Sequence, residues 1–61
     1  MMFKLKGKRV EQGIKLKDFA KELGITTQYL LKIEKGIANP RIDLAKKMSN
    51  ILNTSIEDLF F

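Results

Sequence analysis

Cysteine and histidine are both absent from the 61 residues of this sequence. Without thiols the chain can form neither a disulfide nor a thiolate metal site, and without imidazole it lacks the commonest base and metal ligand near neutral pH. No apolar run approaches the roughly 20 residues of a membrane-spanning helix. Met1-Met2-Phe3 is followed by Lys4 rather than by the apolar stretch of a secretion signal. We therefore expect no enzyme activity, no metal, no cofactor and a cytoplasmic location.

The charge of the chain is positive and unevenly distributed. The formal net charge is +5. Residues 1–35 hold nine Lys or Arg and four Asp or Glu, whereas residues 36–61 hold three of each. The whole excess therefore lies in the first part of the chain. A polyanion is the natural partner of such a surface, although lysine also serves simply to keep a small helical protein soluble.

Apolar residues recur at helical spacing, and no segment alternates with the period of two that a strand requires. Pro40 disfavours a helical backbone conformation at the preceding residue, Asn39, and suits the start of a new helix. The pattern predicts an all-α chain with helices over about Phe3–Gln12, Leu16–Leu23, Thr27–Lys35 and Arg41–Leu52, and a last short helix capped by Ser55. The expected inward residues are Leu5, Arg9, Val10 and Ile14 on the first helix, and Ile42, Ala45, Met48, Ser49 and Leu52 on the fourth.

The second and third expected helices are joined by a tight turn. Gly24 suits the left-handed backbone that ends a helix, and Ile25 follows it as a turn residue. Thr26 can then cap the next helix by accepting from the free N–H groups of its first turn. Two short helices at this spacing form the motif that presents its second helix to the major groove of DNA.

With these elements placed, the chain resembles the Cro/cI-type helix-turn-helix family, the Xre-like regulators of phages and bacteria. The matching segments run from Leu5 to Phe60: residues 5–14, Phe19-Ala20, Leu23-Gly24, Thr26 with Ile33-Glu34 and Gly36, Asn39-Pro40, and residues 52–60. The resemblance implies a compact five-helix, lambda-repressor-like bundle that binds double-stranded DNA as a symmetric homodimer. From the length of the chain we expect one domain over residues 1–61, and from its short helices no membrane partner; no small-molecule ligand is evident.

The resemblance places base contacts at the start of the third helix and one turn further on. These positions are Thr27, Gln28 and Lys32, with Tyr29 at the edge of the groove. Glutamine can bond adenine with two hydrogen bonds, lysine favours guanine, and the Thr27 methyl can meet a thymine methyl. Leu31 lies toward the same side, where it either contacts a thymine methyl or is simply exposed.

Phosphate contacts are expected from the residues that flank the third helix: Lys17, Lys35, Asn39, Arg41 and the backbone amides of the loop over residues 36–40. Relatives often have Ser or Thr followed by Gln where this chain has Lys15 and Leu16. Lys15 cannot cap as a hydroxyl does. The backbone N–H groups there can still bind a phosphate, and Lys17 can replace the missing side-chain contact.

Arg9 and Glu34 both fall on otherwise inward faces of their helices. The resemblance suggests a partly buried ion pair between the first and third helices, and a buried charge needs such a partner. We therefore expect a structural role for both residues.

The last residues, Leu59-Phe60-Phe61, are large and apolar. Leu59 is the best core candidate by its spacing from Ile56. The aromatic pair either packs back onto the fourth helix or, as we expect, forms a dimer interface that also involves Leu59. Such pairing would set two recognition helices about one DNA turn apart and favour a palindromic operator.

Two functions from different classes fit this fold. The first is a sequence-specific DNA-binding regulator, which we expect to repress by occupying an operator because no sensor domain is evident. The alternative is a protein-interaction module of the antitoxin or anti-activator type. A protein-binding surface should be apolar and poor in charge on the third helix, whereas here it is rich in Gln and Lys, with only Tyr29 and Leu31 as exceptions. The first function is therefore favoured.

Overall fold

The computed structural model describes residues 4–60, which form α-helices joined by short loops. These are α1 (Leu5–Glu11), α2 (Leu16–Leu23), α3 (Thr27–Glu34), α4 (Ile42–Leu52) and α5 (Ile56–Phe60). Strands are absent from this range, so the predicted all-α, five-helix architecture is confirmed. The expected start of the first helix at Phe3 lies outside the described residues. Within residues 4–60 no helix combines the length and the apolar character needed to cross a membrane.

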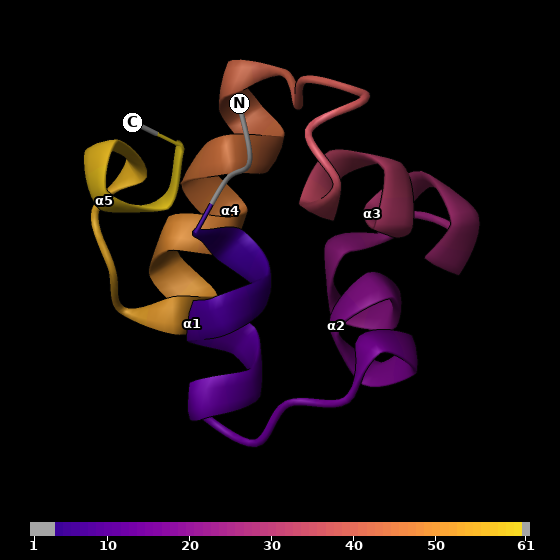
Figure 1. Ribbon diagram of the computed structural model, residues 1–61, viewed down its shortest axis with the longest axis horizontal. Helices are drawn as coiled ribbons and strands as arrows, with labels where there is room; N and C mark the ends of the chain where they lie inside the picture. Colours follow the sequence, from indigo (N-terminus) through magenta and orange to yellow (C-terminus); the bar gives the residue numbers. More distant parts are fainter. Residues whose placement is uncertain (1–3, 61) are drawn as a thin grey trace.

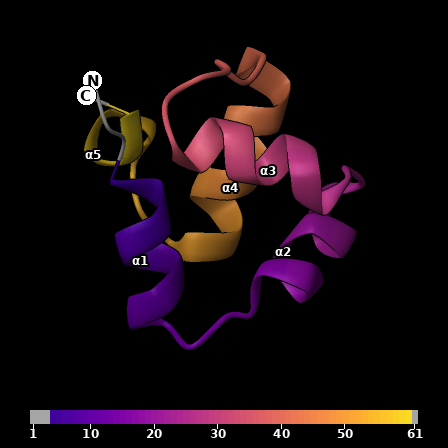
Figure 2. The same ribbon diagram turned by 45° about the vertical axis from the view of Figure 1, so that its right-hand side comes forward.

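The longest helix, α4, runs through the middle of the molecule. In Figure 1 helix α5 lies to its left, α2 and α3 lie to its right, and α1 overlaps its lower end. Seen after a turn of 45°, α3 crosses in front of α4, and α2 lies below it (Figure 2). Helix α3 is therefore supported from behind while its outer side remains open.

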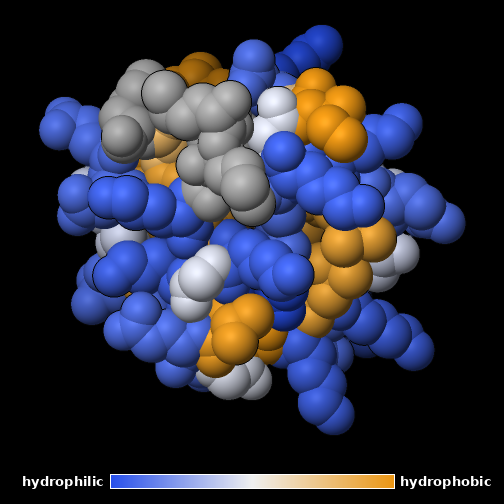
Figure 3. All heavy atoms as spheres, in the orientation of Figure 1, coloured by the Kyte–Doolittle hydropathy of each residue, from blue (hydrophilic) through white to orange (hydrophobic). Residues whose placement is uncertain are grey.

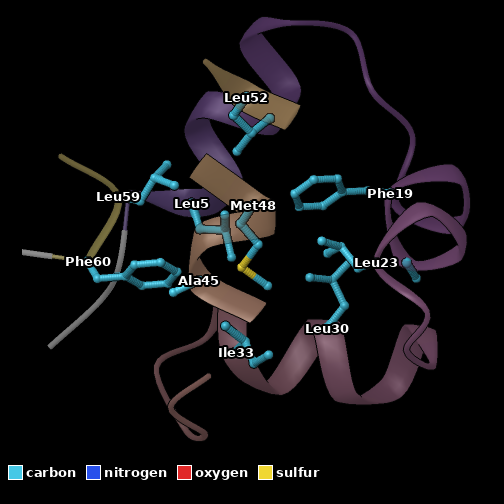
Figure 4. Close-up of a cluster of buried hydrophobic side chains, with 11 residues drawn as sticks. Leu5, Phe19, Leu23, Leu30, Ile33, Ala45, Met48, Leu52, Leu59 and Phe60 are labelled. Atoms are coloured by element: carbon cyan, nitrogen blue, oxygen red, sulfur yellow. The ribbon is translucent and has the colours of Figure 1, made fainter. Parts of the chain in front are cut away.

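The core is built from one apolar stripe on each helix. Side chains from all five helices point toward the centre, with Met48 of α4 between those of α1 and α3 (Figure 4). The fully enclosed members are Leu5, Phe19, Leu30, Ile33, Met48, Leu52 and Leu59. This core is small, as expected for so short a chain, so each buried side chain contributes a large share of the stability.

Helix α4 ends at a residue with left-handed backbone, and the chain is held there by several polar contacts. Asn53 has φ 50°. The Ser49 hydroxyl donates to the Thr54 carbonyl oxygen at 2.6 Å, and the Gln12 side-chain amide donates to the Leu52 carbonyl oxygen. The bond from Gln12 joins the end of α1 to the end of α4, which are far apart in the sequence.

Two residues that we expected to face inward are exposed. Val10 retains 58% of its accessible surface, because the buried side of the short helix α1 is formed by Leu5 and Arg9 alone. Ile42 retains 65%. It starts α4, and side chains in a helix lean toward its N-terminus, so Ile42 extends beyond the core rather than into it.

The prediction that Leu59 and Phe60 form a dimer interface is wrong. Leu59 is fully buried and Phe60 is only 8% exposed, so both belong to the core of a single copy. The Phe60 ring points toward Ala45 of α4, a small residue that leaves room for it (Figure 4). The backbone N–H of Lys4 donates to the Leu59 carbonyl oxygen at 2.9 Å, which fixes α5 against the start of α1. Phe61 lies outside the described residues.

Candidate nucleic-acid interface

The turn between α2 and α3 sets the direction in which α3 leaves the body of the protein. Gly24 has φ 72°, and its N–H donates to the Lys21 carbonyl oxygen. The N–H of Ile25 donates to the Ala20 carbonyl oxygen at 3.0 Å, which completes a Schellman motif. The Thr26 hydroxyl oxygen then accepts from the Tyr29 N–H at 3.1 Å. The expected left-handed glycine and threonine cap are both present.

An ion pair behind α3 holds this helix to α1. The Arg9 Nε atom lies 2.7 Å from Glu34 Oε2, and its Nη2 atom lies 3.3 Å from Oε1. The remaining Nη1 group donates to the Ile14 carbonyl oxygen at 2.8 Å. Arg9 therefore joins α1, the segment before α2 and α3, and the two buried charges are paired as the sequence led us to expect.

The opposite side of α3 is polar and accessible. Gln28, Lys32 and Lys35 are exposed, while Leu30, Ile33 and Glu34 on the other side are buried. Thr27 is half-buried, and its hydroxyl lies 3.4 Å from the Gln28 carbonyl oxygen Oε1. Since Glu34 is buried and paired, the outer side of α3 carries positive charge without an acidic side chain. We call Thr27, Gln28, Leu31, Lys32 and Lys35 the outer face of α3.

Tyr29 lies beside this outer face rather than within it. Its ring is half-buried and packs against the core. It lines a shallow hollow between α3 and α4 together with Ile25, Arg41 and Leu44. The structure thus places Tyr29 toward α4, beside the outer face of α3.

The residues expected to contact phosphate come from α2, from the end of α3, from the loop after it and from the residue before α4. Lys17 is exposed in the first turn of α2, and Lys35 directly follows α3. Asn39 is exposed in the loop, and Arg41 is the exposed residue that precedes α4. All four side chains are therefore accessible from solvent.

The loop after α3 corrects one expectation. Its first three amides are already used, because the N–H of Gly36 donates to the Ile33 carbonyl oxygen, and those of Ile37 and Ala38 donate to that of Lys32. Pro40 has no N–H. Most of this backbone therefore cannot donate to a phosphate. Gly36, at φ 76°, makes the same kind of turn as Gly24, and this signal in the sequence could have revealed the bonds.

The start of α2 departs from the family pattern in the way the sequence indicated. Lys15 precedes the helix with extended backbone and makes no capping hydrogen bond through its side chain. Without a capping side chain, the N–H groups of this first turn remain suited to an anion, and Lys17 adds positive charge beside them.

Apolar surface does not dominate the side of the molecule seen in Figure 1. Hydrophilic side chains cover most of that side, and the apolar ones form small, separate clusters (Figure 3). Among the described residues the exposed large apolar side chains are Val10, Leu31, Ile37 and Ile42. The last two come from the loop after α3 and from the first turn of α4.

Comparisons with known proteins agree with this geometry. The helix-turn-helix family matches residues 5–59. An uncharacterized HTH-type transcriptional regulator of Methanocaldococcus jannaschii is 38% identical over 60 residues, covering 98% of this chain and 91% of that protein. An uncharacterized HTH-type transcriptional regulator of Archaeoglobus fulgidus is 36% identical over 52 residues, covering 85% of this chain and 74% of that protein. The N-terminal DNA-binding domain of SinR from Bacillus subtilis superimposes with a TM-score of 0.75 at 33% identity, covering 87% of this chain and 78% of that domain.

Proposed function

Because this chain belongs to the Cro/cI-type helix-turn-helix family of DNA-binding transcriptional regulators, we propose that it represses transcription by inserting α3 into the major groove of an operator. The family and these relatives are regulators rather than enzymes. Repression requires no surface beyond the one that binds DNA, since an occupied operator excludes other proteins. In bacteria and archaea a regulator binds its operator in the cytoplasm, where we place this protein.

One observation carries the proposal: the outer face of α3 combines exposed hydrogen-bonding groups with positive charge. Gln28 and Lys32 lie one turn apart on this face. Their spacing allows both to reach base edges from one side of a helix, and they carry groups suited to adenine and guanine. We assign base recognition to Thr27, Gln28 and Lys32, with Tyr29 at the groove rim.

Phosphate contacts position the helix and supply most of the salt-dependent affinity. We assign them to Lys17, Lys35, Asn39 and Arg41, which are exposed around α3. The ion pair of Arg9 and Glu34 supports the arrangement from behind and does not contact DNA, because both side chains are buried.

We further propose that two copies bind a palindromic site. Three or four side chains on one helix contact only a few base pairs, so a regulator gains adequate specificity from two half-sites about one helical turn apart. Leu59 and Phe60 are buried within one copy, so we look for the pairing surface among the exposed apolar side chains. Ile37 in the loop after α3 and Ile42 at the start of α4 are 72% and 65% exposed, and we propose these two apolar side chains for it.

Selection of bound duplexes from a random pool tests the proposal. We expect a short sequence repeated as an inverted pair, and sedimentation of the complex should show two copies per duplex. Enrichment of a single half-site would reject the dimer while leaving DNA binding in place. Failure to enrich any sequence at low salt would reject DNA recognition and favour a protein-binding role.

A further inference from the structure

Leu31 is the single large apolar side chain on the outer face of α3. It is 38% exposed, although Leu30 and Ile33 on the same helix are completely buried. Thr27 precedes it by four residues and Lys35 follows it by four, so the three form one row along the helix. By helical geometry Leu31 lies roughly 60° around the axis from Gln28, which places it well within the outer face.

An apolar side chain has little to bind in the major groove. Base edges there present hydrogen-bond donors and acceptors, and the C5-methyl group of thymine is the apolar exception. Leucine placed against a donor or acceptor would remove water from that group without replacing its hydrogen bond, which is unfavourable. A position occupied by leucine in this groove therefore favours a base that carries a C5-methyl group.

We propose that Leu31 is a specificity-determining residue that contacts the C5-methyl group of a thymine in each half-site. The inference rests on the proposed insertion of α3 into the major groove. Gln28 and Lys32 would bond to purine edges while the row containing Leu31 covers the neighbouring pyrimidine. Since 5-methylcytosine presents the same methyl group, cytosine methylation at that position would also raise affinity.

A protein partner is a weaker explanation of the same side chain. Leu31 stands among Gln28, Lys32 and Lys35, all exposed and hydrophilic. Protein interfaces depend on a contiguous apolar centre from which charged residues are depleted. The surroundings of Leu31 are those of a surface that meets a polyanion, within which one apolar contact adds selectivity.

The experiment removes the methyl group from the DNA and the side chain from the protein. Each thymine of the selected duplex is replaced in turn by deoxyuridine, which lacks only the methyl group, and the Kd is measured by fluorescence anisotropy. For the parent protein we expect a loss of about threefold to fourfold at one thymine of each half-site, the effect of one buried methyl-sized group. For Leu31→Ala we expect no loss at that position, because the contact is already absent.

Val10→Ala is the matched control, since it trims an exposed aliphatic side chain on α1. It should reproduce the parent's response to every uracil substitution. In a second arm, cytosine and 5-methylcytosine are compared at the sensitive position, paired with guanine. The methylated form should bind the parent about threefold more tightly and should give Leu31→Ala no advantage.

Either of two results would overturn the inference: no thymine of the site shows a methyl effect, or the effect remains unchanged in Leu31→Ala. A circular dichroism spectrum equal to that of the parent shows that the variant is folded. If the parent binds no duplex at all, the proposed function fails, and this outcome is distinct from binding without a methyl effect.

Discussion

Removing one partner of the buried ion pair should destabilise the protein more than any change on its surface. The side chains of Arg9 and Glu34 are 9% and 2% exposed, and two hydrogen bonds join them. In Glu34→Ala the guanidinium group keeps only its bond to the Ile14 carbonyl oxygen and remains a buried charge without a counter-ion. Such a loss costs about 3–5 kcal/mol.

This cost is large for so small a domain. At ordinary stabilities per residue, 61 residues give a total free energy of unfolding of roughly 3–9 kcal/mol. We therefore expect Glu34→Ala to lose a third or more of the free energy of unfolding of the parent, and to be unfolded at room temperature where that total lies at the low end of the range. Urea unfolding followed by circular dichroism measures the difference from the parent.

Two further variants make this result interpretable. Glu11→Ala removes the acidic partner of an exposed pair, in which Lys8 Nζ lies 3.8 Å from Glu11 Oε2, and should change stability by less than about 0.5 kcal/mol. The double change Arg9→Met with Glu34→Leu removes both charges and should recover much of the lost stability. If Glu34→Ala unfolds within about 1 kcal/mol of the parent, the pair does not hold α3 to α1 as argued.

Two more changes test the backbone and the assembly. Gly7→Ala should raise the free energy of unfolding by about 0.5–1 kcal/mol, since Gly7 is helical and an added Cβ meets nothing within 4 Å. Gly24→Ala also has free space for the Cβ, but its φ of 72° is strained for alanine, so this change should lower the free energy of unfolding by about 1–2 kcal/mol. Equal shifts of the melting temperature in the two variants would contradict a left-handed backbone at Gly24. The double change Ile37→Ser with Ile42→Ser should leave the fold intact and convert a dimer to a monomer in analytical ultracentrifugation, and an unchanged sedimentation coefficient would exclude this pairing surface.

Local signals made the helix-turn-helix motif predictable from the sequence. Gly24 has no side chain and so adopts the left-handed backbone that ends α2, and the hydroxyl of Thr26 caps α3. Arg9 and Glu34 both lie on inward faces, and an ion pair was predictable because an unpaired buried charge is unfavourable. These features depend on short-range geometry or on a strong energetic requirement.

Other features depended on tertiary packing that periodicity does not encode. Phe60 is buried because α5 lies against α4 at the small residue Ala45, a contact that the spacing within α5 could not reveal. Val10 and Ile42 match an apolar period yet lie where no neighbouring helix covers them. The bond from Gln12 to Leu52 joins residues 40 positions apart and had no recognisable signal.

Binding of Gln28→Ala and Lys35→Ala to the selected operator, measured over a range of salt concentrations, tests most directly whether α3 enters the groove. The Gln28 change should cost about 1–3 kcal/mol on the best site and relax selectivity at one base position, with an unchanged salt slope. The Lys35 change should weaken binding to all sequences alike and reduce the salt slope by about one. If both folded variants bind as the parent does, α3 does not present this face to DNA.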